Sequence, residues 1–237
     1  MILAAGRGTR LAALEPDVPK PLVQIGGEPL LARQLRYLGA NGILRVVVNA
    51  HHLSAAIESF AAEYRSLDGP ELIVVTEPQL LGTAGGVRNA LAQLGSEPFV
   101  VLYCDVLISE PLAPILAAHR RSGAIATLAV YESGELDAKG VVSVDAGGRV
   151  TGFVERGSFP QDARGLVNAG LYVLEPSLVA RIPAGTVADF GHDVFPDALS
   201  RGEHLAVHLL PAPVLDVGTP DALRLARLNP PFAGQAA

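Results

Sequence analysis

Short apolar runs alternate with helix-like stretches along the first half of the chain. The run at residues 2–5 predicts a strand, and the leucines from Leu31 to Leu38 then repeat at helical spacing, with Gly39 or Gly42 as a helix end. Because strands that alternate with helices are joined by crossovers, the pattern favours a parallel sheet covered on both faces. The other strands of this half are predicted at residues 46–48, 72–75 and 99–104, and the other helical stripes at 57–64, 87–94 and 112–119.

The pattern changes after about Gly123, where apolar runs follow one another more closely. A hairpin is predicted across the turn Asp145–Gly148. A last helix is predicted with Thr219 as its N-cap, Pro220 at its first position and an apolar face from Leu223 to Leu228. Further strands are predicted at residues 125–130, 141–144, 150–154, 167–174 and 205–210, and short helices near 177–181 and within 193–200.

The length fits one large α/β domain or two small ones. With 237 residues, the chain can bury a sizeable core without disulfides or a structural metal. It contains no internal repeat, low-complexity segment or clear linker. We therefore predict a single domain over residues 1–228, whose doubly wound part ends near residue 123, and a flexible tail at 229–237 that is rich in Pro, Gly and Ala.

The charge pattern argues against two classes of partner. The net charge is −6 without any block of Lys or Arg, whereas nucleic acid and anionic membranes bind clustered positive charge. No apolar run approaches the roughly 20 residues that span a bilayer. The apolar N-terminal run precedes its basic residues, which is the reverse of a signal peptide. The single cysteine, Cys104, suits a reducing compartment, so we expect a cytoplasmic protein.

A glycine-rich loop, Gly6-Arg7-Gly8-Thr9-Arg10, follows the first predicted strand. Ligands of open α/β sheets bind beyond the carboxyl ends of the strands, where this loop would lie. Glycines there let backbone N–H groups close on phosphate oxygens, and Arg10 could add a charged fork. Two glycines alone are also typical of an ordinary tight turn. A dinucleotide fingerprint is excluded by Leu11, and the Gly-Lys-Ser/Thr of a P-loop does not occur.

A lysine stands between two prolines shortly after this loop, in Pro19-Lys20-Pro21-Leu22. Proline fixes the backbone on both sides, which would keep the lysine aimed at one anion. The loop and Lys20 together favour a site for an anionic small molecule.

These two motifs, Leu3–Leu11 and Pro19–Leu22, resemble the signature of the sugar-nucleotide pyrophosphorylases, or sugar-1-phosphate nucleotidylyltransferases. The resemblance is greatest to mannose-1-phosphate and manno-heptose-1-phosphate guanylyltransferases that lack a β-helix domain. It implies an α/β, Rossmann-like fold of the glycosyltransferase-A type, with a central mixed, mostly parallel sheet flanked by helices. It also implies transfer of a nucleotidyl group from a nucleoside triphosphate to a sugar-1-phosphate, with release of pyrophosphate. Residues 1–123 would bind the nucleotide and 124–228 the sugar.

The resemblance also implies roles for the residues of the first half. The loop and Arg10 would hold the triphosphate, and Lys20 would meet phosphate in the transition state. A second glycine segment, Leu81–Gly86, would pack its backbone against the base, because a planar base needs a close approach to the main chain. By itself, that segment is equally typical of a helix N-terminus. The nucleotide-binding candidates are Leu3, Ala4, Ala5, Gly6, Gly8, Thr9, Gln79, Gly82 and Thr83.

Asp105 ends the strand predicted at residues 99–104. A carboxylate at the carboxyl end of a central strand is well placed to hold Mg²⁺, which prefers one or two carboxylates plus water and phosphate oxygens. A solvated loop aspartate is the alternative. The later Asp216-Val217-Gly218-Thr219-Pro220 resembles a family motif whose aspartate joins the same metal. The resemblance therefore implies Mg²⁺ as cofactor, held by Asp105 and Asp216, with these two, Arg10 and Lys20 as the catalytic residues.

Three segments of the second half follow the family order and imply a sugar-phosphate site. Glu155 would accept hydrogen bonds from sugar hydroxyls, Asn168 would contact the sugar, and Gly140 would let the ring approach the backbone. Taken alone, Glu155 is also typical of a charge at a strand end, Asn168 of a turn and Gly140 of a hairpin. Arg156 stands where the family usually has a phosphate-contacting lysine, and it keeps the charge with a different geometry.

Weaker resemblances imply which nucleotide base and which acceptor the protein uses. Leu81–Gly85 and Asp189–Asp193 resemble the guanylyltransferase branch, which implies GTP with mannose-1-phosphate or a manno-heptose-1-phosphate. We interpret Asp189–Asp193 itself as packing and loop ordering, and Cys104 as a buried strand residue. A uridylyl- or thymidylyltransferase, a non-sugar acceptor such as phosphocholine and a non-catalytic sugar-nucleotide sensor are the alternatives. The chain ends where many relatives add a left-handed β-helix domain, so acetyl transfer by such a domain is not expected.

Overall fold

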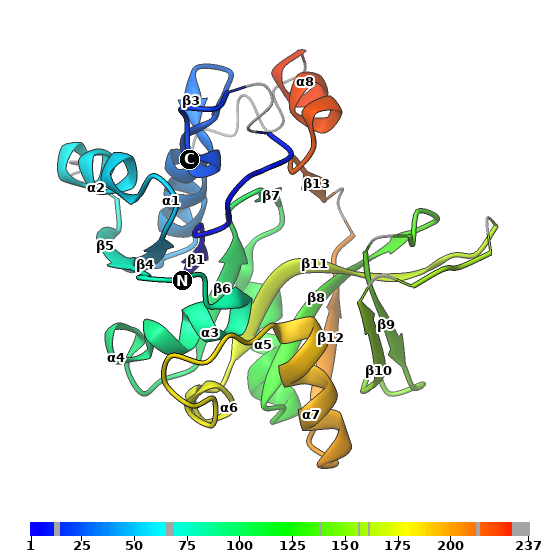
Figure 1. Ribbon diagram of the computed structural model, residues 1–237. Coiled ribbons are helices and arrows are strands. Elements are labelled where there is room, and N and C mark those ends of the chain that lie inside the picture. The colour runs from blue at the N-terminus through cyan, green and yellow to red at the C-terminus, as the bar shows by residue number, and fades with distance from the viewer. Residues whose placement is uncertain are drawn as a thin grey trace. The chain divides into compact units, whose positions relative to one another are not determined.

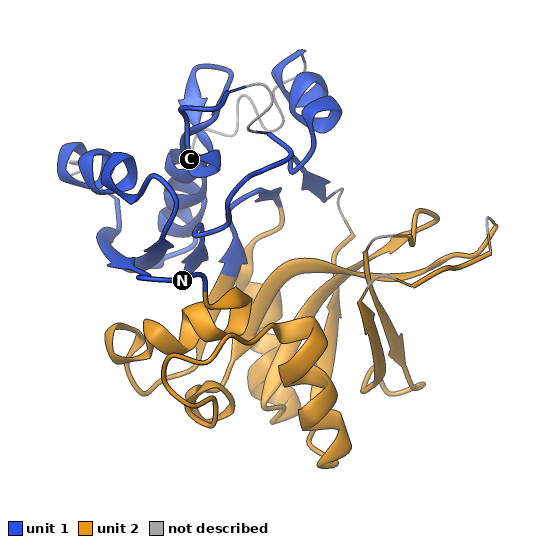
Figure 2. Cartoon of the chain, in the orientation of Figure 1, with its two compact units in different colours: residues 1–80, 102–109, 214–237 blue, residues 81–101, 110–213 orange. Residues whose placement is uncertain are grey.

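The computed structural model describes residues 1–11, 15–64, 69–137, 139–155, 157–160, 162–211 and 214–228. The chain divides into two compact units, coloured separately in Figure 2. Unit 1 comprises residues 1–80, 102–109 and 214–237, and unit 2 comprises residues 81–101 and 110–213. Each unit therefore consists of segments that are not continuous in the sequence. The expected single domain stays a prediction, and the predicted tail at 229–237 lies outside the described residues.

Unit 1 contains parallel β-structure with the strand order β6-β1-β4-β5 (Figure 1). Ile2 is in register with Val48 on one side and with Leu102 on the other. The bounds are β1 (Ile2–Leu3), β4 (Arg45–Ala50), β5 (Glu71–Thr76) and β6 (Phe99–Tyr103), of which the last two residues belong to unit 1. Strand β1 is shorter than the predicted run 2–5, and Cys104 follows β6 instead of ending it.

The helices of unit 1 are α1 (Leu30–Ala40), α2 (Ser54–Glu63) and α8 (Pro220–Leu228). On α1 the predicted stripe is fully buried. Of the stripe predicted on α2, only Ile57 is buried, although the rings of Phe60 and Tyr64 stack on each other. Helix α8 begins as predicted, because the N–H of Ala222 bonds the Thr219 hydroxyl at 3.3 Å. Its predicted apolar face is narrower, since Leu225 and Leu228 are exposed.

The described residues of unit 1 also form four short strands and a 3-10 helix, none of which was predicted. The 3-10 helix η1 covers Lys20–Leu22, where two prolines interrupt regular structure. The strands pair antiparallel, β2 (Gln24–Ile25) with β3 (Glu28–Pro29) and β7 (Val106–Leu107) with β13 (Leu215–Asp216). Two-residue strands are too short to produce a hydrophobic period, so the sequence carries no signal for them.

Unit 2 is built on a mixed sheet with the order β10-β9-β11-β8-β12. Only β12 and β8 pair in parallel. The hairpin predicted across Asp145–Gly148 is confirmed, with the Gly148 N–H bonded to the Asp145 carbonyl at 3.0 Å. The bounds are β8 (Ala126–Ser133), β9 (Gly140–Val144), β10 (Val150–Glu155), β11 (Gly165–Leu174) and β12 (Leu205–Leu209).

The helical stripe predicted at residues 87–94 is two helices, because the chain turns at Ala90. The helix predicted within 193–200 is confirmed at residues 195–200, and a π-helix that was not predicted precedes it. The helical elements of unit 2 are α3 (Gly82–Asn89), α4 (Leu91–Leu94), α5 (Leu112–Ser122), α6 (Pro176–Ala180), the π-helix η2 (Phe190–Val194) and α7 (Phe195–Ser200). Across the described segments, none of the helices combines the length and apolar character needed to cross a bilayer.

Candidate active site

The predicted phosphate loop follows β1 in unit 1. Gly8 has a φ of +60°, a left-handed conformation that favours glycine, and its carbonyl accepts the Leu11 N–H at 2.8 Å. Gly6 is exposed, and a Cβ added there would meet nothing within 4 Å. The backbone at Gly6 is therefore open to a ligand, as the phosphate-binding prediction requires.

Lys20 lies against this loop. A Cβ added to Gly8 would stand 3.2 Å from the Lys20 Cβ, so a side chain at Gly8 would push the lysine away. The Lys20 ammonium forms an ion pair with Asp105, and only 17% and 20% of the two side chains are exposed. The structure thus places the first predicted metal ligand beside the loop and the lysine, which the sequence had already linked to one anion site.

Asp216 joins the same site through the pairing of β7 with β13. The Val217 N–H bonds the Asp105 carbonyl at 2.9 Å, and the Gly218 N–H bonds the Asp216 carboxylate at 2.7 Å. A Cβ on Gly218 would lie 2.8 Å from Asp216 Oδ1, 3.1 Å from Asp105 Oδ2 and 3.2 Å from Arg10 Nη2. Two carboxylates and one guanidinium therefore converge around the Cα of Gly218, and any larger residue there would fill the space between them.

This donor set fits the predicted Mg²⁺. Two carboxylate oxygens face one small space, and Mg²⁺ needs only one or two protein carboxylates when phosphate and water complete its shell. The described residues contain no group of three or more His, Cys, Asp or Glu able to hold a metal. Two carboxylates would leave the other positions of a Mg²⁺ shell to phosphate and water.

Cys104 is buried beside these groups. Burial raises the pKa of its thiol, and the neighbouring Asp105 carboxylate raises it further. The thiol therefore stays protonated at neutral pH and is a poor nucleophile. The sequence-based interpretation of Cys104 as an inert buried residue agrees with this, although it lies in the turn after β6.

A buried polar pair behind the loop was missed in the sequence. Asn49 on β4 and Glu77, just after β5, are each only 2% exposed, and the Asn49 amide donates to the Glu77 carboxylate at 2.6 Å. The Asn49 carbonyl oxygen accepts the N–H of Ala4 at 2.7 Å, two residues before the glycine loop begins. The available signal was an asparagine within an otherwise apolar buried run.

Replacing Asn49 by leucine is expected to lower the free energy of unfolding by about 2–4 kcal/mol. Leucine has a similar volume but leaves the Ala4 N–H and the buried Glu77 carboxylate without this partner. Urea denaturation measures the loss. The same change at the exposed Asn89 should cost less than about 0.5 kcal/mol. An Asn49→Leu variant as stable as the wild type would contradict this account of the pair.

The predicted base segment lies at the start of α3 in unit 2. A Cβ on Gly82 or Gly85 would collide with the carbonyl oxygen of Ala188 or Thr186, respectively. These two glycines are thus required by another backbone segment of the protein. The Thr83 hydroxyl donates to Asp189 at 2.8 Å. The base contact predicted for Gly82 and Thr83 stays a prediction, as does that for Gln79, which is exposed in unit 1.

Two of the sugar-site candidates lie together in unit 2. Glu155, at the end of β10, pairs in register with Gly140 on β9. A Cβ on Gly140 would lie 3.0 Å from Glu155 Oε2 and 2.9 Å from the Phe153 ring. Glycine at 140 therefore leaves room for this carboxylate, whereas the resemblance implied room for a sugar ring.

Asn168 stands at an irregularity in β11. Its side-chain amide donates to the Tyr172 hydroxyl at 2.7 Å, and its carbonyl oxygen accepts the Gly170 N–H at 3.0 Å. These bonds hold the bulge in place and fix the orientation of the amide. Arg156, the fourth sugar-phosphate candidate, lies outside the described residues.

Comparison with known proteins identifies the family. A family model described as "Nucleotidyl transferase" matches residues 1–229. The chain belongs to the nucleotidyl transferase family. This confirms the resemblance that the glycine loop and the Pro-Lys-Pro-Leu motif indicated.

Curated relatives within the family carry two different base specificities in their names. The mannose-1-phosphate guanylyltransferase of Mycobacterium tuberculosis is 33% identical over 222 residues, which cover 93% of this chain and 61% of that protein. The UTP–glucose-1-phosphate uridylyltransferase of Synechocystis sp. is 31% identical over 214 residues, which cover 85% of this chain and 55% of that protein. The chain thus spans less than two thirds of the length of these relatives.

A solved structure confirms the fold class. HddC from Yersinia pseudotuberculosis matches with a TM-score of 0.82 over 96% of both chains, at 24% identity. At this identity the likeness concerns the fold. The predicted α/β, Rossmann-like class with a mixed, mostly parallel sheet flanked by helices is therefore confirmed.

Proposed function

We propose that the chain transfers a nucleotidyl group from a nucleoside triphosphate to a sugar-1-phosphate, giving a nucleotide sugar and pyrophosphate. The observation that carries this proposal is the convergence of Arg10, Asp105 and Asp216 around Gly218, with Lys20 on Asp105 and the open glycine loop beside it. Family membership and the names of the curated relatives support it. A cytoplasmic location, suited to the single buried Cys104, is part of the proposal.

The chemistry of this reaction matches the groups present in unit 1. An oxygen of the acceptor phosphate attacks the α-phosphorus in line, so the main difficulty is the crowding of anionic groups. Arg10, Lys20 and the loop N–H groups would neutralise and position these phosphates. Mg²⁺ held by Asp105 and Asp216 would supply further neutralisation when bound. A sugar-1-phosphate is already a dianion near neutral pH, so no side chain has to remove a proton.

Unit 2 would supply the acceptor site. Glu155 and Asn168 offer a carboxylate and an amide of fixed orientation, which suit sugar hydroxyls, and Arg156 would pair with the acceptor phosphate. A plate assay that crosses five nucleoside triphosphates with sugar-1-phosphates and phosphocholine, read as pyrophosphate release, tests the proposal. Release with phosphocholine alone would reassign the acceptor. The absence of release from every combination would favour a non-catalytic sensor.

We expect GTP to be the preferred nucleotide, with mannose-1-phosphate or a manno-heptose-1-phosphate as acceptor. Guanine presents donors at N1 and N2, which backbone carbonyls or the Gln79 amide could accept. Such a pocket would reject ATP by about 1–3 kcal/mol for each acceptor left unpaired. Equimolar competition among GTP, UTP, dTTP, CTP and ATP measures the preference. Dominance of UTP or dTTP with every acceptor would show that the uridylyl or thymidylyl alternative is correct.

A further inference from the structure

The start of α3 in unit 2 is covered by the chain segment Thr186–Asp193. The N–H groups of Ala84 and Gly85 both bond the Ala188 carbonyl, at 3.0 and 3.1 Å, and the Ala188 N–H bonds the Leu81 carbonyl at 2.9 Å. First-turn N–H groups of a helix normally seek an outside acceptor. Here the Ala188 carbonyl is the acceptor for two of these N–H groups. The segment Thr186–Asp193 therefore holds the Gly82–Thr83 turn in place.

Asp189 is the side chain that ties this segment to α3. One carboxylate oxygen accepts the Thr83 hydroxyl at 2.8 Å, and the other accepts the Gly191 N–H at 3.1 Å. The Thr83 hydroxyl in turn accepts the Phe190 N–H at 3.0 Å. The Asp189 carboxylate therefore bonds the predicted base segment through one oxygen and the following turn through the other.

Gly191, whose N–H bonds Asp189, lies against the side chain of Glu155. A Cβ on Gly191 would collide with Glu155 Oε2 and would lie 2.8 Å from the Phe153 ring. Gly191 belongs to the π-helix η2, and such single π-turns are frequent at functional sites. The position of the Gly191 turn therefore limits where the Glu155 carboxylate can lie.

We propose that Asp189 is a positioning residue for both substrates, rigidly relating the base-contacting turn Gly82–Thr83 to the sugar-contacting carboxylate Glu155. This inference rests on the proposed function, which assigns the base to Gly82–Thr83 and the sugar to Glu155. Asp189 touches neither substrate. It acts through Thr83 on one side and Gly191 on the other.

The fold around Asp189 does not depend on this carboxylate alone. Phe190 and Phe195 pack on each other and on Tyr172, with ring centroids 5.3–5.4 Å apart, and all three are fully buried. Burial of these rings supplies most of the local stability. A change confined to Asp189 is thus expected to alter the alignment of the turns and leave the segment folded.

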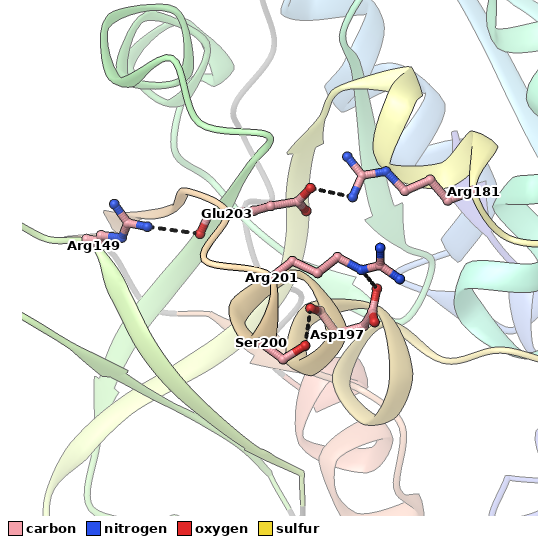
Figure 3. A network of polar contacts seen from close by, with 6 residues as sticks. All are labelled: Arg149, Arg181, Asp197, Ser200, Arg201 and Glu203. Atoms are coloured by element: carbon pink, nitrogen blue, oxygen red, sulfur yellow. Dashed lines mark hydrogen bonds and ion pairs between the residues drawn. The ribbon is translucent and has the colours of Figure 1, made fainter.

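Asp189→Asn is the first test. An amide has one acceptor oxygen and one NH2 donor, so asparagine cannot accept from both the Thr83 hydroxyl and the Gly191 N–H, and it lacks the charge that strengthens both bonds. We expect the KM values for the nucleotide and for the sugar phosphate each to rise about tenfold, with kcat within about threefold of the wild type. The matched control is Asp197→Asn on α7. The Asp197 carboxylate pairs with Arg201 at 2.8 Å (Figure 3), and we expect its replacement by an amide to alter neither KM.

Further variants test separately the contact of Asp189 with Thr83 and its contact with Gly191. Thr83→Val keeps the shape but removes the hydroxyl, so it should raise the KM for the nucleotide about as much as Asp189→Asn, whereas Thr83→Ser should restore it. Gly191→Ala forces Glu155 to move and should raise mainly the KM for the sugar phosphate. Gly134→Ala is its control, because the nearest atom to a Cβ there is 3.8 Å away.

The outcomes distinguish this inference from the function on which it rests. If the wild-type protein is active but Asp189→Asn raises neither KM, or raises only the KM for the nucleotide, Asp189 does not relate the two sites. Loss of kcat alone would likewise overturn the positioning role. If the wild-type protein releases pyrophosphate from no combination of substrates, the proposed function fails and the inference falls with it. Amide hydrogen exchange at Phe190 and Gly191, faster in Asp189→Asn, checks independently that the bonds were broken.

Discussion

Asp105→Asn and Asp216→Asn are each expected to lower kcat by about 10²–10³-fold or more while the protein stays folded. The two carboxylates face the same space around Gly218, and an amide is a much weaker ligand for Mg²⁺ than a carboxylate. Each variant should also need a higher Mg²⁺ concentration for half-maximal activity, since one charged ligand remains in both.

The two variants should differ in stability. Asparagine at 216 can still accept the Gly218 N–H, which the carboxylate accepts at 2.7 Å. Asparagine at 105 loses its ion pair with Lys20, whose side chain is largely buried. We therefore expect a lower melting temperature for Asp105→Asn than for Asp216→Asn. Asp221→Asn, on an exposed pair with Arg224, is the control for the charge change. Near-normal turnover in either purified variant would remove that residue from the proposed metal site.

The regular elements were predictable because their periods are long enough to detect. Strands β4 and β5 are runs of branched apolar residues, buried on β4 and half-buried on β5, and α1 buries one leucine stripe. The break at Ala90 was not predictable, because the apolar stripe continues through it without Gly or Pro. The turn there is fixed by bonds from the Ala90 N–H to the carbonyls of Gly86 and Val87.

The catalytic candidates were predictable as residue types but not as a site. Nothing in the sequence shows that Asp216 meets Asp105, because the short β7–β13 pairing that joins them has no hydrophobic period. Nor does it show that Lys20 pairs with Asp105. The resemblance implied the roles, and the structure of unit 1 supplies the geometry that makes them compatible.

Glycine and asparagine positions illustrate a different limit. The sequence indicates that Gly82 and Gly140 need room, but it cannot tell which group fills that room. In the structure the groups are the Ala188 carbonyl at Gly82 and Glu155 with Phe153 at Gly140. Asn49 gave only a weak signal, because its role depends on Ala4 and Glu77, which lie just after β1 and β5.

Lys20→Ala is expected to reduce kcat about 10²-fold or more and to raise the KM for the nucleotide much less. A lysine fixed between Pro19 and Pro21 and held against Asp105 is already placed where phosphate charge would develop. Such preorganised charge stabilises the transition state more than the bound substrate, so its loss appears in kcat.

Lys20→Arg tests whether the position of the positive charge matters or only its presence, and Lys139→Ala is the control. Lys20→Arg keeps the charge, but the planar guanidinium is larger and bonds through a fork, so it should restore only part of kcat. The chain's other lysine, Lys139, pairs with Glu135 at 3.6 Å, and Lys139→Ala should leave turnover unchanged. Steady-state kinetics under saturating Mg²⁺ separates the two parameters. A Lys20→Ala variant whose kcat is normal and whose KM alone rises would show that the lysine only binds the nucleotide. A Lys20→Arg variant with full kcat would show that the charge suffices whatever its geometry.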